Sequence, residues 1–220
     1  MYQYSLDVML RGARFIAIGV PLTIWISLAS MALGLVIGLP LGTIRGLRVR
    51  VIDSLIRGYV EIFRNTPVLV QIVWFYYALP ILTKINLDAF TAGTLALGLN
   101  ASAYICEIVR GGIRTTPMGQ SDAGLSLGFT QVGVMQYIVI PQVMRKMLAP
   151  FLNQFVFLIK DSALVAYIGV LDVMHRGDIV TVQTARPLEA YTTVAIVYFV
   201  LCLLASEMTR RIEVRYAIPE

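Results

Sequence analysis

The stretch that decides the fold is Phe15–Ile44, which reads FIAIGVPLTIWISLASMALGLVIGLPLGTI and contains no charged residue. A helix needs about 20 largely apolar residues to cross the hydrocarbon core of a bilayer, so this segment is long enough to span it. The segment is also far longer than the short apolar region of a cleaved signal peptide. We therefore expect it to remain in the protein as a membrane-spanning helix.

The composition extends this interpretation to the whole chain. Apolar residues make up 58% of the 220 residues and charged residues only 14%, and the mean hydropathy is +0.76. A soluble domain has about 25% charged residues, so the bilayer is the expected environment. The net charge of +5 does not indicate a nucleic-acid partner, because the basic residues lie between apolar segments. Cys106 and Cys202 are isolated and His175 is the only histidine, so we expect no metal site.

Further apolar runs predict one all-α membrane domain over residues 1–220, with about five transmembrane helices. The second run is short, and the amphipathic stretch before it, Val51–Phe63, is expected to enter the membrane in part. Gly34, Gly38 and Gly42 form a ladder of small residues that lets a neighbouring helix approach the first span closely. The expected spans are Phe15–Ile44, Pro67–Leu82, Phe90–Val109, Pro150–Leu171 and Ala190–Ser206.

The basic residues predict the orientation, because cytoplasmic loops are enriched in Lys and Arg. With five spans and the N-terminus outside, the larger group of basic residues falls on the cytoplasmic side. The inner group is Arg45, Arg48, Arg50, Arg57, Arg110, Arg114, Arg145, Lys146, Arg210, Arg211 and Arg215. The outer group is Arg11, Arg14, Lys84, Arg176 and Arg186. We therefore expect the N-terminus outside and the C-terminus in the cytoplasm.

A polar segment between the third and fourth spans, residues 119–128, reads GQSDAGLSLG and predicts a short cytoplasmic helix. Asp122 suits a helix N-terminus, where negative charge is favourable. Gly128 would end the helix, and Pro141 would open the next one. The segment is either a surface on which a partner docks or a turn that only links two spans.

The same segment resembles the EAA loop of the permease subunits of bacterial ABC importers. That pattern is Glu-Ala-Ala, three residues, Gly, nine residues and Ile-x-Leu-Pro. Asp122-Ala123-Gly124, Gly128 and Ile138-Val139-Ile140-Pro141 fit it without a gap, with Gly119 just before. Asp122, Gly124 and Ile140 depart from the pattern, in place of Glu, Ala and Leu. Gly124 weakens a helix by up to about 1 kcal/mol relative to Ala. By this resemblance, the helix at about residues 119–128 is expected to couple the chain to an ATPase.

Other stretches are similar to the branch of this family that imports polar amino acids. The resemblance extends over about residues 14–212. The stretches are Tyr59–Gln71 (YVEIFRNTPVLVQ), Asn100–Gly112 (NASAYICEIVRGG), Pro150–Phe155 (PFLNQF) and Lys160–Val165 (KDSALV).

The resemblance implies the type I ABC importer permease fold in a bacterial cytoplasmic membrane. It also implies a second permease subunit, identical or related, together with two separate ATPase subunits and an external substrate-binding protein. The chain itself is not expected to be an enzyme, to hold a catalytic residue or to bind a cofactor. Lys84, Lys146 and Lys160 are the only lysines and none follows a glycine, so no phosphate-binding P-loop is present. ATP and Mg²⁺ are therefore expected on the partner ATPase.

Four polar side chains are candidates for lining a substrate pocket: Asn100, Tyr104, Asn153 and Gln154. Asn100 and Tyr104 are four residues apart, so they share a helix face. The alternative is that these side chains only hydrogen-bond neighbouring helices. We expect relatives that carry cationic amino acids to have an acidic residue at position 154, so the neutral Gln154 argues against an arginine- or lysine-specific pocket.

Glu107, Lys160 and Asp161 are ionisable residues inside apolar spans, where such groups often mark a pathway. Glu107 alternatively forms a local pair with Arg110, three residues on. Lys160 and Asp161 are adjacent and point in different directions, so they either pair with other helices or contact substrate.

Three other classes of function fit the sequence less well. A secondary transporter usually has internal repeats, and none is apparent. An intramembrane enzyme needs a catalytic set that one histidine on an outer loop cannot provide. An anchoring subunit without a transport role does not explain the polar residues of the candidate pocket.

Overall fold

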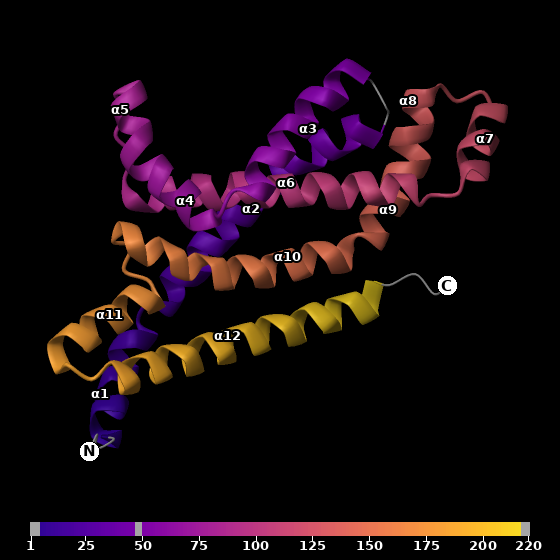
Figure 1. Ribbon diagram of the computed structural model, residues 1–220. Helices are drawn as coiled ribbons and strands as arrows, with labels where there is room; N and C mark the ends of the chain where they lie inside the picture. The colour runs from indigo at the N-terminus through magenta and orange to yellow at the C-terminus, as the bar shows by residue number, and fades with distance from the viewer. Residues whose placement is uncertain (1–4, 47–49, 217–220) are drawn as a thin grey trace.

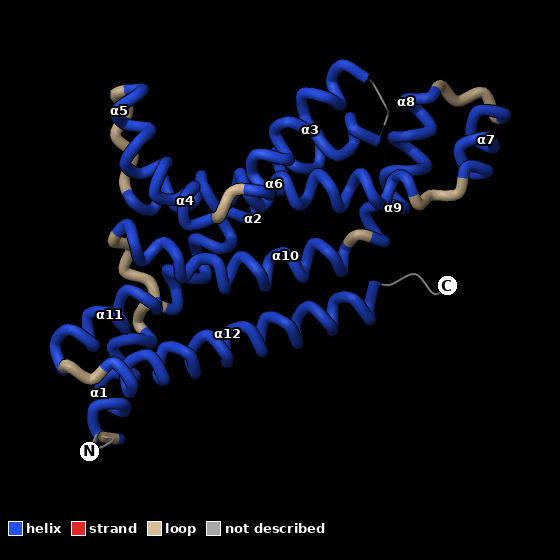
Figure 2. The backbone as a smooth tube through the Cα atoms, viewed as in Figure 1, coloured by secondary structure: helices blue, strands red, loops and turns tan. Residues whose placement is uncertain are grey.

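The computed structural model describes residues 5–46 and 50–216, and in that part of the chain every regular element is helical (Figure 2). The long units are α2 (Val20–Gly46), α6 (Ala89–Arg114), α10 (Leu148–Asp161), which the 3-10 helix η3 (Ser162–Ile168) continues, and α12 (Pro187–Tyr216). The short units before α6 are α1 (Leu6–Ala17), α3 (Arg50–Asn65), α4 (Val68–Val73), the π-helix η1 (Trp74–Ala78) and α5 (Leu79–Thr83). Those after it are α7 (Met118–Ser126), α8 (Gln131–Val134), the π-helix η2 (Met135–Val139), α9 (Ile140–Lys146) and α11 (Val173–Thr184).

The long helices form a stack in which α12, α10 and α6 lie side by side and α2 crosses at an angle (Figure 1). Helices α3 and α4 pack on α6 away from α12, and from their junction α3 and the α4–α5 arm diverge as a V. The hairpin of α7 and α8 projects from one end of the stack, and α1 and α11 lie at the other end.

The lengths and hydropathy of these helices agree with a membrane domain. Val20–Gly46, Ala89–Arg114, Leu148–Ile168 and Pro187–Arg215 are each long and apolar enough to cross a bilayer. Ile52–Asn65 and Val68–Thr83 pass the same test as a pair that is bent by 103°. The prediction of an all-α membrane fold with about five spans is therefore confirmed.

The first predicted boundary is wrong by five residues. The span expected from Phe15 begins at Val20, because a turn at Ile18 and Gly19 separates α1 from α2. A Cβ atom on Gly19 would lie 2.5 Å from the backbone nitrogen of Val173, so only glycine allows this turn to pack against the start of α11 (Val173–Thr184). Arg48, expected on the cytoplasmic side, lies outside the described residues.

The segment after the fourth span was expected to be an external loop, but it contains helix α11. Asp172 caps this helix: its fully buried carboxylate accepts a hydrogen bond from the backbone N–H of His175, at 2.8 Å. The same carboxylate accepts one from the hydroxyl of Tyr198 on α12, at 2.9 Å. Burial raises the pKa of the Asp172 carboxyl, while these hydrogen bonds act to lower it. Asp172 therefore ties α11 to α12 at the end of the stack where α1 lies.

The glycine ladder of the first span brings α2 against α6. A Cβ atom on Gly38 would lie 2.6 Å from the carbonyl oxygen of Ser102, and one on Gly42 would lie 2.7 Å from that of Cys106. Both oxygens belong to the backbone of α6, which cannot move aside as a side chain can. The predicted close approach at these glycines is confirmed, with α6 as the neighbouring helix.

We expect Gly38→Ala to destabilise the protein, because the added methyl group forces α2 and α6 apart. Overpacking of this kind costs about 1–3 kcal/mol. The measurement is the thermal unfolding midpoint of the purified protein in detergent. Gly111→Ala is the matched control on α6, since a Cβ atom there would have no neighbour within 4 Å. Equal midpoints for the two variants would contradict the close packing.

Candidate functional site

The α7–α8 hairpin is the first part of the candidate site, and its local structure follows from glycine. Gly128 ends α7 in the left-handed region, with φ of +87°. The backbone N–H of Phe129 donates to the carbonyl of Gly124 at 3.2 Å, and that of Gly128 donates to the carbonyl of Leu125 at 3.0 Å. This pair of bonds is the Schellman motif, and the predicted stop at Gly128 is confirmed.

The structure differs from the sequence-based expectations for Asp122 and, in part, for Pro141. Asp122 is the fifth residue of α7, and the first turn of that helix holds no acidic residue, so its expected place at the N-terminus is wrong. The helix starts earlier because Pro117 precedes it and its first residue is Met118. Pro141 lies at the start of α9 as expected, but α8, η2 and α9 follow one another without a break. The π-helical turn before Pro141 loosens the hydrogen-bond ladder where proline has no N–H to donate.

Gly124, which stands in place of the second Ala of the EAA pattern, has a packing role. A Cβ atom there would lie 2.7 Å from the Cδ1 atom of Ile138 and 2.9 Å from the Cγ2 atom of Val134. The glycine therefore lets α7 pack closely against the second arm of the hairpin. Ala123, its neighbour, is exposed, and so is Gly119.

The hairpin exposes apolar side chains at the end of the stack. Leu127 is 78% exposed and Val132 is 68% exposed, and the rings of Phe129 and Tyr137 lie 6.3 Å apart. We call the exposed set, together with Leu125, the hairpin surface. Exposed apolar patches of this kind mark sites of protein or membrane contact. Basic residues flank the hairpin on both sides: Arg114 ends α6 before it, and Arg145 and Lys146 end α9 after it. The hairpin therefore lies at the basic end of the membrane domain.

The second part of the site is the break between α3 and α4. The Asn65-Thr66-Pro67 interruption leaves backbone carbonyls that a bilayer cannot satisfy. The Gln71 side chain donates to the carbonyls of Phe63 and Thr66, at 2.8 and 2.9 Å. Asn100 of α6 also donates to the Phe63 carbonyl, at 2.7 Å. Asn100 is only 5% exposed, so its amide holds the broken helix against α6.

The other candidate pocket residues are more accessible. Tyr104 is 36% exposed, and the guanidinium group of Arg64 lies 5.1 Å from the centre of its ring. Asn153 is exposed and Gln154 half-buried on α10. Among the described residues, the side-chain amides of Asn153 and Gln154 make no hydrogen bond, so no such bond connects them to Asn100. Tyr104, Asn153 and Gln154 thus retain polar groups available to a ligand.

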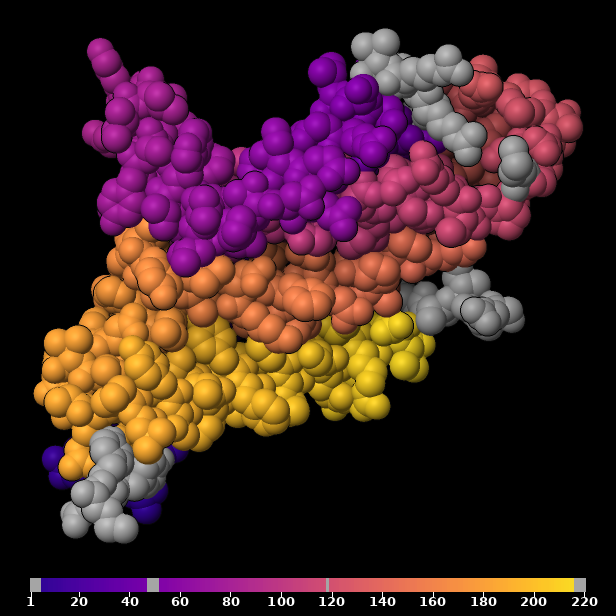
Figure 3. Space-filling view, in the orientation of Figure 1, coloured from indigo at the N-terminus to yellow at the C-terminus, as the bar shows by residue number. Residues whose placement is uncertain are grey.

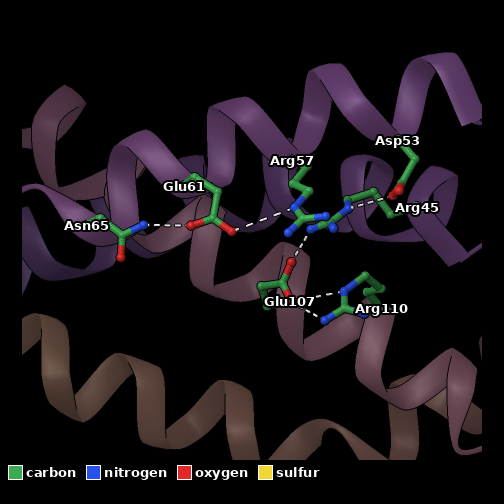
Figure 4. Close-up of polar contacts among 7 residues, drawn as sticks. All are labelled: Arg45, Asp53, Arg57, Glu61, Asn65, Glu107 and Arg110. Atoms are coloured by element: carbon green, nitrogen blue, oxygen red, sulfur yellow. Dashed lines mark hydrogen bonds and ion pairs between the residues drawn. The ribbon is translucent and has the colours of Figure 1, made fainter.

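A cluster of charges joins α2, α3 and α6 (Figure 4). Arg45 donates to Asp53 of α3 at 2.9 Å and also binds Glu107 of α6. Glu107 in turn accepts from the Nε atom of Arg110 at 2.9 Å. The local pair of Glu107 with Arg110 is present, and Arg45 extends it across three helices. Arg45 is 6% exposed, so removing one partner would leave a buried charge uncompensated.

Lys160 and Asp161 lie at the far end of α10 from this cluster. Lys160 faces a groove of about 1000 Å³ that Tyr198, Cys202 and Arg210 of α12 also line. Its ammonium group lies 5.5 Å from the centre of the Phe157 ring. Asp161 is half-buried and makes no side-chain hydrogen bond among the described residues. No ion pair with another helix is formed by either residue in the part of the chain described here.

Two features of the site were missed from the sequence. Gln71 carries a signal, since it is an amide inside an apolar run directly after a proline break, but only the fold shows that it binds the carbonyls of the break. The pairing of Arg45 with Glu107 spans 62 positions, and nothing local in the sequence joins them.

The chain is also similar to proteins of known families. The family described as "Binding-protein-dependent transport system inner membrane component" matches residues 34–218. The glutamine transport system permease protein GlnP of Escherichia coli (strain K12) is 35% identical over 201 residues, which are 91% of this chain and 92% of that protein. A putative glutamine transport system permease protein of Rickettsia typhi (strain ATCC VR-144 / Wilmington) is 33% identical over 199 residues, covering 90% of this chain and 91% of that protein.

Solved structures agree with the family. A chain of an amino acid ABC transporter crystallised with histidines has a TM-score of 0.88 and 33% identity, covering 98% of this chain and 100% of its own. A chain of the MetNI methionine ABC transporter in an inward-facing conformation has a TM-score of 0.78, covering 93% of this chain and 97% of its own. At 19% identity that second likeness supports the fold alone. The chain therefore belongs to the family of binding-protein-dependent transport system inner membrane components, and it is a permease subunit of an ABC importer with the type I fold.

Proposed function

We propose that this permease subunit carries a polar amino acid across a bacterial cytoplasmic membrane by alternating access. Two permease subunits, identical or related, enclose the pathway. Two separate ATPase subunits bind ATP and Mg²⁺, and an external binding protein delivers the substrate. The chain itself performs no covalent chemistry.

The hairpin surface is the observation that carries this proposal. A stretch with EAA-like spacing forms a capped helix at the basic end of the membrane domain, and apolar side chains around it are exposed. A surface of this kind fits a groove on a partner better than it fits water. Energy must come from such a partner, since the sequence has no glycine-lysine pair for a P-loop.

We infer the orientation in the membrane from the end of the molecule that carries the hairpin. The α7–α8 hairpin, α9 and the end of α6 lie together at the proposed cytoplasmic end, while α1 and α11 lie at the proposed external end (Figure 1). The N-terminus is then outside and the C-terminus in the cytoplasm, in accord with the positive-inside rule.

The substrate class rests on the neutral amides of the site. Asn153 and Gln154 supply donors and acceptors without a charge, which suits an uncharged polar side chain. The naming of relatives as glutamine transport permeases supports the same class. Tyr104, Lys160 and Asp161 are further candidates for contact with the amino acid.

Coupling is tested by Asp122→Lys and Gly128→Phe. We expect both variants to insert normally but to lose transport and to co-purify less ATPase. Lysine reverses the charge on the exposed face of α7, and phenylalanine strains a residue with φ of +87°. Glu213→Lys is the matched control, an equal charge reversal at an exposed residue of α12. Full co-purification and full transport in both test variants would exclude docking at this hairpin.

Orientation is tested with single cysteines in a background that lacks Cys106 and Cys202. Val182→Cys lies on α11 and is 83% exposed, so it should react with an impermeant thiol reagent added to intact cells. Leu127→Cys is 78% exposed on the hairpin and should react only after the membrane is opened. The reverse pattern would overturn the orientation and the coupling assignment together.

Selectivity is tested by Gln154→Glu, which places an anion at a half-buried position of α10. The proposal assigns this position to the pathway. An unpaired charge is penalised there and a cation relieves the penalty, so preference should move toward cationic amino acids. The measurement is substrate-stimulated ATPase activity in proteoliposomes, because the external binding protein can then be varied or omitted. Gln183→Glu, the same change at an exposed residue of α11, is the control. An unchanged substrate profile would leave Gln154 with only a structural role.

A further inference from the structure

Arg64 lies beside the break between α3 and α4, and within the described residues no acid neutralises its positive charge. Its side chain is exposed, and its guanidinium group lies 5.1 Å from the centre of the Tyr104 ring on α6, which is a cation–π distance. Arg45 and Arg110, in the charge cluster of Figure 4, both bind Glu107 instead. Arg64 is therefore positioned by a ring and is open to an anion.

The depth of Arg64 in the membrane domain makes this charge unusual. Its neighbour Tyr104 lies ten residues before Arg114, the basic end of α6, which is about 15 Å along the helix. The hydrocarbon core of a bilayer is about 30 Å thick, so the guanidinium group lies near its middle. Ionisable groups at this depth face a protein interior or a water-filled cavity, and they often mark a transport pathway.

The two sides of the break differ in polarity. Helix α3 and the α4–α5 arm diverge as a V, and the surface is hollowed between them (Figure 3). A groove of about 310 Å³ at the base of the V has a mainly apolar lining, to which Ile62, Val70 and Trp74 contribute. Arg64 does not line this groove and faces Tyr104 instead. The cation therefore lies on the side of the break that faces α6.

The electronegative groups of the break are already in use. The carbonyl of Phe63 accepts from the side chains of Gln71 and Asn100. Gln71 also donates to the carbonyl of Thr66. Because two amides satisfy these carbonyls, the guanidinium group of Arg64 gives the break a cationic character toward a ligand.

The anion that fits this position is the carboxylate of an amino acid. A guanidinium group forms two parallel hydrogen bonds with a carboxylate, and such charge-assisted pairs are strong and specific. A lipid phosphate lies at the membrane surface, about 15 Å from this depth, so it does not reach the site. The neutral amides of Asn153 and Gln154 suit the variable side chain, whereas the carboxylate is common to all amino acids.

We propose that Arg64 binds the α-carboxylate of the transported amino acid and that the Tyr104 ring positions its guanidinium group. Arg64 then selects amino acids as a class and rejects amines and amides that lack the carboxylate. This inference rests on the proposed function and adds how the pathway recognises the part that all its substrates share.

The test measures equilibrium binding to the purified complex of permease and ATPase in detergent, without the external binding protein. The probes are L-glutamine, L-asparagine and L-serine, each compared with its α-carboxamide, in which a neutral amide of similar shape replaces the carboxylate. We expect the unmutated complex to bind the acid of at least one pair about tenfold more tightly than the amide. This ratio, which we call the carboxylate preference, is the readout.

Arg64→Gln removes the charge but keeps a polar side chain. We expect it to weaken binding of the acid about ten- to a hundredfold with little change for the amide, because only the carboxylate loses a charge-assisted bond. Arg64→Lys keeps the charge without the planar fork, so it should recover part of the carboxylate preference. Arg11→Gln is the matched control, the same change at an exposed arginine of α1.

The positioning role of Tyr104 has its own readout. Tyr104→Phe keeps the ring beneath the guanidinium group, so the carboxylate preference should persist even where both ligands bind more weakly. Tyr104→Leu removes the ring and should lower the preference about two- to tenfold. Equal preferences in these two variants would show that the ring does not position Arg64.

The possible outcomes separate this inference from the function on which it rests. If Arg64→Gln keeps the carboxylate preference, the inference is wrong and the transport function stands. A lower thermal unfolding midpoint of that variant would then indicate that Arg64 pairs with an acid of the second permease subunit. Equal binding of acids and amides by the unmutated complex would also overturn the inference alone. If the unmutated complex binds none of the probes, the proposed transport of an uncharged polar amino acid is contradicted, and the inference fails with it.

Discussion

The close packing of α2 against α6 is the constraint on which the other helices depend. Both helices are largely apolar, and lipid offers no hydrophobic drive to press two apolar helices together, so their association depends on contact between backbones. Gly38 and Gly42 provide that contact, and the carbonyl oxygens of α6 lie where side chains would otherwise be. Helix α6 is buried along most of its length as a result, and the other spans pack around this pair.

Helix α3 is held to this pair by polar groups as much as by apolar ones. At its start Asp53 binds Arg45 of α2, and in its middle the hydroxyl of Tyr59 donates to the carbonyl of Leu99 at 3.1 Å. At its end the carbonyl of Phe63 accepts from Asn100. Replacing buried ion pairs with apolar residues is often neutral for stability, so we attribute to this set the fixed angle of α3 rather than extra stability.

The sequence predicts the helices well because the bilayer permits few alternatives. Length and hydropathy are sufficient to find α2, α6, α10 and α12, and glycine chemistry places the end of α7 at Gly128. The site is predicted less completely. Asn100 was expected to line a pocket or bond a neighbouring helix, and the structure shows it bonded to the carbonyl of Phe63. Arg45 and Glu107 lie 62 positions apart, and their pairing depends on how α2 crosses α6. Periodicity identifies faces, but tertiary packing decides which polar groups on a face are already used.

The arrangement also links the hairpin directly to the break between α3 and α4, beside which the proposed function places the pathway. Helix α6 is one uninterrupted helix whose C-terminal residue, Arg114, lies four residues before α7. Seven residues before that end Glu107 binds Arg45, and seven residues earlier still Asn100 holds the break of α3 and α4. A force applied to the hairpin therefore acts on a rigid helix that is bonded to both halves of the broken span. Movement of the hairpin surface should shift the break, and with it Tyr104 and Arg64, without any change in the fold of the individual helices.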